Sequence, residues 1–417
     1  MKNLGRYSMG VGDRFGHQAE AQLKAIIDAK ELGVDITPVW NKSYREHQII
    51  HSQPSNTRLK ADEAVKNLNW KENYFVDADH IGIDTVELFI ESSDFYTIDV
   101  ADSIGISPEN EDLEKFLSEN QKFIGELELP NSSLRIIVTE KTIESAGKKY
   151  LTAVKQAGKI YRKIEQLKGK GNFVTEVSMD ETDEPQSPSE LFFILSAIAS
   201  EKIPAQTIAP KFSGRFNKGV DYVGDVERFK KEFELDLMVI AKAVEIFDLP
   251  KDLKLSVHSG SDKFSIYKPI KETLKKSNAG LHIKTAGTTW LEELIGLAAS
   301  EGKGLEMAKE IYSKAFERFD ELCGPYKTVI DIDSNLLPSP DEVKRWDGNK
   351  FAETLRHDLS NDNYNKHFRQ MLHVSYKIAA ELGDRYIDAL NKYKEQIALN
   401  VEENILERHI KKIFPAE

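Results

Sequence analysis

The chain has 417 residues, of which 40% are hydrophobic and 30% charged, and this composition supports a large buried core and argues against disorder. With 69 acidic and 57 basic residues its net charge is −12, which argues against nucleic-acid partners because phosphate binding needs a basic face. We expect a cytoplasmic protein without a membrane partner. Cys323 is the only cysteine, and the first residues (MKNLGRYSMG) lack the apolar core of a secretory signal. The longest apolar run, residues 191–199, is too short to span a membrane.

Strand-like segments recur along most of the chain. Eight of them are expected at residues 6–11, 35–40, 73–76, 95–100, 172–177, 205–210, 253–258 and 281–286. Amphipathic helical patterns lie between most of them, such as residues 19–33 and 226–247. Strands that alternate with helices form parallel sheets, and eight of them predict an α/β fold of the (β/α)₈ TIM-barrel type.

Two stretches do not belong to a simple barrel. Residues 134–139 are also strand-like, and more than seventy residues separate the fourth strand from the fifth, so we expect an insertion around 101–170 that contains a long helix. After the eighth strand the sequence is almost wholly helical. We therefore predict a catalytic barrel domain over 1–329 and an α-helical extension over 330–417 that packs on it.

Polar side chains gather where the predicted strands end, which is where a (β/α)₈ barrel carries its active site. They are Asp77, Asp79, His80, Glu176, Lys211, His258, His282 and Lys284. Each histidine alone is compatible with a hydrogen-bonded structural residue, but three of them with several carboxylates can form an open divalent-metal site. The ligand types leave zinc, nickel, manganese, cobalt and iron open.

Two loops add candidate binding residues. The segment GVGDRFG at 10–16 has the spacing G-x-G-x-x-x-G, which differs from the dinucleotide-binding fingerprint, so we expect a tight turn that presents Arg14 to the barrel mouth. In HSGSDKFSIY at 258–267, Asp262 either caps backbone amides or binds substrate hydroxyls.

Five blocks, in this order, resemble the bacterial tagaturonate epimerase family, which interconverts tagaturonate and fructuronate. The blocks are GRYSMGVGDRFGHQAEAQLKA, VDADHIG, TEVSMDET, SVHSGSDKFSIY and HIKTAGTTWLEE. The resemblance implies a divalent metal and an acid/base pair acting on a small uronate or ketose. Related activities remain open: 4-epimerisation of the neutral ketohexoses tagatose and fructose, or a metal-dependent sugar aldolase. Self-association into a homo-oligomer is also left open.

The resemblance assigns roles residue by residue. Asp79 resembles the proton acceptor and Glu176 the proton donor, while His80, His258 and His282 would complete a three-histidine metal site. The partner of the substrate carboxylate is not assigned by the resemblance. From residue type the candidates are the cations Arg14, Lys211, Lys263 and Lys284.

The chemistry of such an epimerase is constrained by its substrate. The inverted carbon is one atom beyond the neighbour of the ketone, so simple enolisation cannot invert it. Retro-aldol cleavage and recombination, with a metal near the ketone oxygen and two acid/base groups, is one route. Transient oxidation by a nicotinamide and direct removal of the carbon-bound proton are the alternatives.

Overall fold

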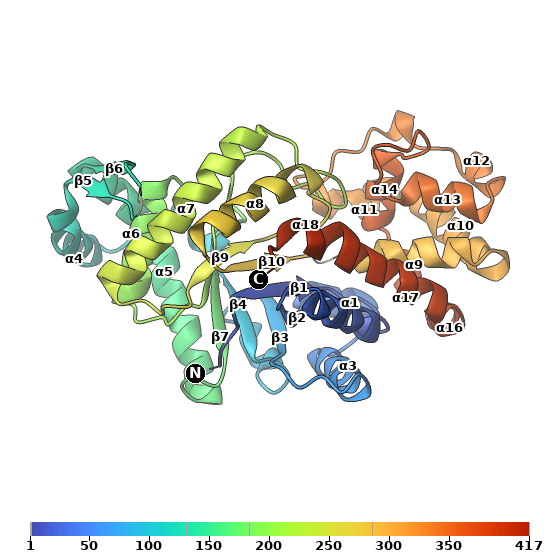
Figure 1. Cartoon of the computed structure of the whole chain (residues 1–417), viewed down its shortest axis with the longest axis horizontal. Coiled ribbons are helices and arrows are strands. Elements are labelled where there is room, and N and C mark those ends of the chain that lie inside the picture. Colours follow the sequence, from blue (N-terminus) through green and yellow to red (C-terminus); the bar gives the residue numbers. More distant parts are fainter. Residues whose placement is uncertain (1, 131, 183, 286, 417) are drawn as a thin grey trace.

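A closed barrel of eight parallel strands forms the centre of the computed structural model, which describes residues 2–130, 132–182, 184–285 and 287–416 (Figure 1). The strands are β1 (Tyr7–Val11), β2 (Thr37–Ser43), β3 (Phe75–Ile81), β4 (Phe95–Asp99), β7 (Val174–Ser178), β8 (Thr207–Ala209), β9 (Lys254–Val257) and β10 (Leu281–Lys284). Their order around the barrel is β1-β10-β9-β8-β7-β4-β3-β2. All eight predicted strands and the (β/α)₈ fold are confirmed, although Ala286 of the last predicted strand lies outside the described residues.

Helices cover the outside of the barrel. They are α1 (Ala19–Glu31), α2 (Tyr44–Ile50), α3 (Pro54–Asn67), α5 (Glu140–Lys168), α6 (Pro188–Ser200), α7 (Val226–Phe247), α8 (Phe264–Ser277) and α9 (Thr288–Ala299). Outward strand residues such as Met9, Val76 and Leu255 are buried in the apolar core that these helices share. Between β3 and β4 the crossover is only the short 3₁₀ helix η1 (Val86–Phe89).

The barrel interior changes from apolar to polar along the strands. A small apolar cluster consists of Leu4, Val39, Phe75, Phe95 and Val174. Because side chains alternate along a strand, the residue two positions further on also faces inward. Those residues are polar in four strands: Asn41, Asp77, Thr97 and Glu176. The apolar cluster therefore supports a polar layer on the side of the barrel mouth.

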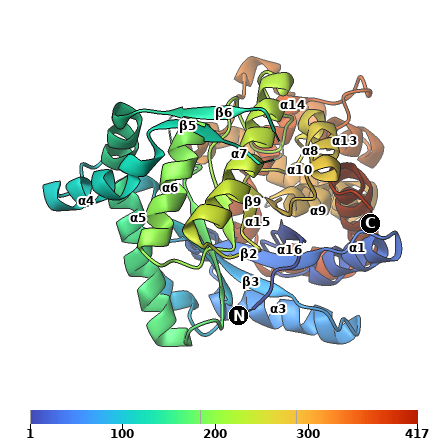
Figure 2. The same cartoon turned by 60° about the vertical axis from the view of Figure 1, so that its left-hand side comes forward.

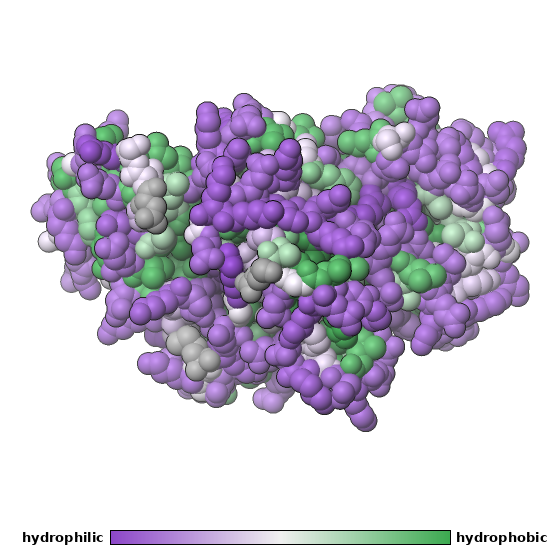
Figure 3. All heavy atoms as spheres, viewed as in Figure 1, coloured by the Kyte–Doolittle hydropathy of each residue, from purple (hydrophilic) through white to green (hydrophobic). Residues whose placement is uncertain are grey.

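The expected insertion lies between β4 and β7. It contains α4 (Asn110–Asn120) and an antiparallel hairpin of β5 (Gly125–Glu128) and β6 (Arg135–Val138), followed by α5. The strand-like segment 134–139 thus forms a hairpin outside the barrel and not a ninth barrel strand. Hydrophobic residues show at the surface over this insertion on the left of Figure 3. Within the hairpin, Ile137 is 60% exposed.

The helical extension lies on the opposite side of the barrel from the insertion (Figures 1 and 2). It is preceded by α10 (Gly302–Glu317) and α11 (Phe319–Cys323), and its helices are α12 (Pro340–Lys344), α13 (Gly348–Leu355), α14 (Lys366–His373), α15 (Tyr376–Glu381), α16 (Asp384–Lys392), α17 (Lys394–Glu403), the π-helix η6 (Asn404–Ile410) and α18 (Lys411–Ile413). The last of these pack against α1 and α8, and so complete the ring of helices around the barrel. The boundary at 329/330 stays a prediction. Among the described residues no helix is long and apolar enough to span a membrane.

Glu293 of α9 lies at the joint between the barrel and the extension. Its carboxyl group accepts hydrogen bonds from Gln18 at 3.1 Å, just before α1, and from the Tyr386 hydroxyl of α16 at 2.9 Å. Burial, reinforced by the nearby Asp13, raises the pKa of Glu293 from 4.5 to about 8. The folded protein therefore keeps a proton on Glu293 at neutral pH.

This raised pKa predicts a specific pH dependence of stability. Between pH 4.5 and about 8 the unfolded chain loses the Glu293 proton and the folded chain retains it, so the contribution of Glu293 to stability falls as pH rises. Urea unfolding at pH 5 and pH 8 should show a smaller loss of stability with pH for Glu293→Gln than for the unsubstituted chain. Equal losses in the two proteins would contradict this.

Candidate active site

A β-bulge shapes the end of β3. The register between β3 and β4 shifts between Ala78 and Ile81, and His80 within the shift has a φ of +52°. Such a left-handed conformation is uncommon for a residue other than glycine and is often found at functional sites. The Nε2 atom of His80 lies 3.9 Å from Asp79 Oδ1. The bulge therefore places two adjacent residues, which a regular strand would direct to opposite faces, near the same point.

Lys284 stands among the carboxylates of the barrel interior. Its ammonium group lies 2.8 Å from Asp77 Oδ2, 2.7 Å from Asp79 Oδ1 and 3.1 Å from Glu176 Oε1. It also donates to the hydroxyl of Thr97. One buried cation thus joins carboxylates from β3 and β7.

The pKa values of this group follow from burial and from Lys284. Burial raises the pKa of Asp77, and the negative charges of Asp79 and Glu176 raise it further. Lys284 lowers it in part, and the pKa of Asp77 reaches about 7. Burial also raises the pKa of Asp79 and of Glu176. At Asp79 the positive charges of Lys284 and His80 outweigh burial, and at Glu176 those of Lys284 and His258 do so. Both pKa values therefore fall below their usual range. Asp79 and Glu176 are therefore ionised at neutral pH.

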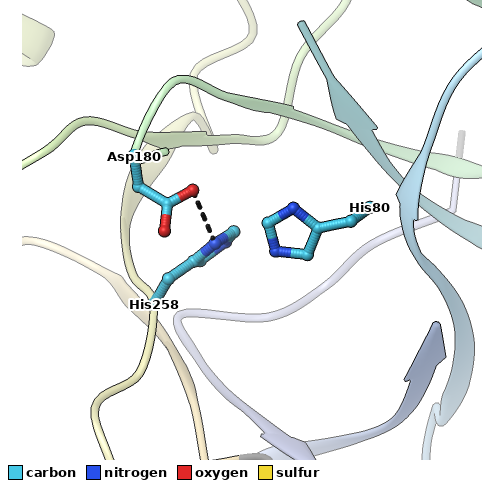
Figure 4. Close-up of side chains that lie close together, drawn as sticks. All are labelled: His80, Asp180 and His258. Carbon is cyan, nitrogen blue, oxygen red and sulfur yellow. Dashed lines mark ion pairs between the residues drawn. The ribbon is translucent and has the colours of Figure 1, made fainter. Parts of the chain in front are cut away.

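Three potential metal ligands converge beside this group. They are His80, Asp180 two residues after β7, and His258 directly after β9 (Figure 4). One ligand atom of each lies within 4.8 Å of the others. His258 Nδ1 is 3.2 Å from Asp180 Oδ1, yet this buried nitrogen has no hydrogen-bond partner among the described residues. Two imidazoles and a carboxylate that meet at one point fit a divalent cation.

Each of these imidazoles is oriented by a second carboxylate. His80 Nδ1 lies 3.1 Å from Asp99 Oδ2, and His258 Nε2 lies 2.7 Å from Glu176 Oε1. A histidine that ligates a metal usually donates its other N–H to such an oxygen, which fixes the tautomer and the ring. This leaves His80 Nε2 and His258 Nδ1 as the lone-pair donors.

The charge around the two imidazoles also fits a cation. Burial disfavours the protonated form of His80, but Asp79, Asp99 and Asp180 outweigh it and raise its pKa to about 10. Asp180 and Glu176 likewise outweigh burial at His258 and raise its pKa to about 9. The carboxylates therefore exceed the positive charge that Lys284 supplies, and a divalent cation would balance them.

His282, the third imidazole expected from the sequence, lies elsewhere in the barrel interior. Its Nδ1 is 2.9 Å from the Ser8 hydroxyl. It is not part of the convergent group of His80, Asp180 and His258, nor of the other group of described residues whose ligand atoms converge, which is His80, Asp99 and Glu181. Its buried Nε2 has no hydrogen-bond partner among the described residues. Burial lowers its pKa to about 3, so the ring is neutral, as a metal ligand must be.

The predicted substrate-binding residues have different surroundings. Arg14 follows β1, is 9% exposed, stacks on Tyr376 at 3.9 Å and pairs with Glu46 at 3.1 Å. Lys211 follows β8 and its ammonium group donates to the carbonyl of Thr182. Arg14 therefore remains a candidate at the mouth.

Asp262 and Lys284 have other partners in the structure. Asp262 is fully buried and forms an ion pair with Arg369 of the extension at 3.0 Å. Lys284 is engaged by the three carboxylates described above. Substrate binding by these two residues stays a prediction.

Asp180, Asp99 and Arg369 were not singled out from the sequence. A signal existed for the two aspartates, because both end or follow a barrel strand. Nothing in the sequence indicated Arg369, whose partner is 107 positions away along the chain.

Removing the charge of Lys284 tests the carboxylate cluster. Lys284→Met leaves buried carboxylates unpaired and should lower the free energy of unfolding by about 3–5 kcal/mol, measured by urea titration. The matched control is Lys268→Met, because the Lys268 side chain is 85% exposed and should be nearly neutral on substitution. Similar losses in the two variants would show that Lys284 does not hold the cluster together.

Comparisons with known proteins identify the family of this chain. The family model of tagaturonate epimerase matches residues 2–413. A tagaturonate/fructuronate epimerase of Thermotoga maritima is 27% identical, over 97% of this chain and 80% of that protein. A crystal structure of fructuronate-tagaturonate epimerase from Cohnella laeviribosi in complex with two glycerols has a TM-score of 0.82 at 21% identity over 99% of this chain and 82% of that one. Its native form has a TM-score of 0.79 at 22% identity over 98% and 81%.

The family match spans nearly the whole length of the molecule, barrel and extension alike. The structural neighbours share its fold over the same span. The chain therefore belongs to the tagaturonate epimerase family and is an epimerase, an enzyme of the isomerase class.

Proposed function

We propose that this epimerase interconverts tagaturonate and fructuronate by retro-aldol cleavage and recombination with a bound divalent cation. The observation that carries the proposal is that Asp79 and Glu176 both contact Lys284, at 2.7 and 3.1 Å, next to the convergent His80, Asp180 and His258. The names of the relatives support the substrate pair.

The substrate decides which chemistry is needed. With the ketone numbered C2, the two uronates differ at C4. In the proposed route the C4 hydroxyl loses its proton, the C3–C4 bond breaks, and its electrons pass to the C2 carbonyl to give an enediolate and an aldehyde. The aldehyde turns, the bond re-forms on its other face, and the new hydroxyl takes up a proton.

Asp79 is the proposed acceptor of the hydroxyl proton. Its side chain is 10% exposed at the mouth, and its lowered pKa keeps it ionised at neutral pH. A carboxylate of low pKa is a weak base, so the substrate must be polarised as well. A divalent cation held by His80, His258 and Asp180 would supply that polarisation as a Lewis acid.

Glu176 is the proposed proton donor. Because it is ionised in the resting structure, it can donate a proton only after it has accepted one. The Lys284 ammonium group lies 2.7 Å from Asp79 and 3.1 Å from Glu176, so a proton taken up by Asp79 can be returned through Lys284 to Glu176.

His80, His258 and Asp180 are the proposed ligands of the cation. The arrangement of Asp99 and Glu176 behind the two imidazoles supports this set. His282 is retained as a further candidate, because its Nε2 has no partner among the described residues. Zinc, nickel, manganese, cobalt and iron all accept imidazole and carboxylate ligands.

Arg14 is the proposed partner of the substrate carboxylate. Glu46, the carbonyl of His373 and the ring of Tyr376 hold its guanidinium in place. No hydrogen bond of its Nη2 to another described residue is present. A planar group with free N–H donors suits a carboxylate. Lys211, whose ammonium group meets a carbonyl oxygen, is the weaker candidate.

Two related activities would use the same residues. An epimerase of tagatose and fructose would need no carboxylate partner, and the fixed position of Arg14 at the mouth favours the uronates instead. A sugar aldolase would release the two three-carbon fragments without rejoining them. The identity of the product separates all three.

Turnover in heavy water tests the proposed function. Chelator-treated protein should be inactive, and protein resupplied with a divalent cation should convert tagaturonate to fructuronate that retains protium at C4, as followed by proton NMR. Asp79→Asn should lower the rate by about 10²- to 10⁴-fold, because a positioned base is lost. Asp35→Asn is the matched control, since the Asp35 side chain is 72% exposed.

Other outcomes would redirect the assignment. Deuterium at C4 would indicate direct deprotonation and contradict the retro-aldol route. Full activity after chelation would contradict the need for a cation. No product from tagaturonate, with a cation bound, would overturn the uronate assignment and make tagatose the next substrate to test.

A further inference from the structure

The loop that carries His258 is held in an unusual backbone conformation. Ser259 has a φ of +50° and Asp262 a φ of +61°, and neither is glycine. Conformations of this kind persist only where surrounding contacts over-determine them. The contacts that hold residues 258–263 therefore also set the position of the His258 ring.

Part of this support comes from the loop and its barrel neighbours. The buried ammonium group of Lys263 donates to the carbonyls of Asn217, Val220 and Ser261 at 2.9, 2.7 and 2.8 Å. The hydroxyl of Tyr267 donates to the carbonyl of Gly260 at 2.6 Å. These bonds tie the loop after β9 to the loop after β8.

The remaining support comes from the helical extension. Arg369 of α14 is 0% exposed, and its guanidinium pairs with Asp262 Oδ2 at 3.0 Å. The same group donates to the carbonyl of Gly219 at 2.5 Å and to that of Leu355 at 2.8 Å. In addition, the backbone N–H of Asp262 donates to His409 Nε2 of η6 at 3.1 Å. One buried guanidinium thus joins both loops to the extension.

We infer that Arg369 is a positioning residue for the active site: it fixes the loop 258–263 and so keeps His258 Nδ1 directed toward Asp180. The inference rests on the proposed cation site at His80, Asp180 and His258. Substituting a residue that holds a metal ligand in position, without itself binding the metal, commonly changes metal affinity by about 10- to 100-fold. By this contact the extension is part of the active site and not only a cover on the barrel.

The experiment compares three substitutions in the full-length protein. Arg369→Gln removes the charge that Asp262 needs, whereas Arg369→Lys keeps it but loses the planar group that reaches three partners at once. Arg356→Gln is the matched control: Arg356 is also in the extension, but it contacts Asn400 and Glu403 within the extension. Cobalt affinity is measured by visible absorbance, and hydrogen exchange is measured at the amides of 259–263 and of β3.

We expect both Arg369 variants to bind cobalt about 10- to 100-fold more weakly than the unsubstituted protein. We also expect the substitutions to accelerate hydrogen exchange more at the amides of 259–263 than at those of β3. Arg356→Gln should change neither quantity. Should Arg369→Gln not fold, Arg369→Lys decides alone. Unchanged cobalt affinity in a folded Arg369 variant, or equal acceleration of exchange in the loop and in β3, would overturn the inference.

A failure of the proposed cation site gives a different result. If the unsubstituted protein binds no cobalt, that site is wrong, and selective exchange in the Arg369 variants still decides whether Arg369 holds the loop.

Discussion

The ammonium group of Lys284 is the contact on which the barrel mouth depends, because it is the positive charge placed among three buried carboxylates. Burying one of these carboxylates alone would be costly, and each would then take up a proton instead of remaining ionised. Lys284 keeps Asp79 and Glu176 charged and near one another. The apolar cluster below it, which includes Phe75 and Phe95, closes the other end of the barrel interior. The charged groups of the barrel interior thereby lie on the side of the mouth.

The carboxylates still exceed the cations around His80 and His258, and this excess connects the electrostatics to the proposed mechanism. Without a metal the two imidazoles hold protons, as their raised pKa values indicate. In the proposed cation site they would be ligands, and Asp99 and Glu176 would keep their rings in place. Positive φ values at His80 and Ser259 show that the backbone on both sides of this point is constrained. The extension contributes to that constraint through Arg369.

Most of the fold could be predicted from the sequence, because alternating apolar segments and amphipathic helices are local patterns. Active sites of (β/α)₈ barrels lie where the strands end, and this predicted site residues Asp79, His80, Glu176 and His258. These four residues lie together in the structure. What could not be predicted depends on barrel register and on contacts across the chain. Lys284 meets Asp77 207 positions away, and the bulge at His80 has no local sequence signal. For the same reason Asp262 was expected to bind substrate, since its partner in the extension could not be seen.

Anomalous diffraction from crystals grown with zinc tests the central claim most directly, namely that the excess negative charge at the mouth is balanced by a bound cation. The account predicts a peak about 2.0–2.2 Å from His80 Nε2, from His258 Nδ1 and from an oxygen of Asp180. A peak bound by His282 without Asp180 would restore the three-histidine set expected from the sequence. No peak at the barrel mouth, in crystals that bind zinc elsewhere, would contradict the claim.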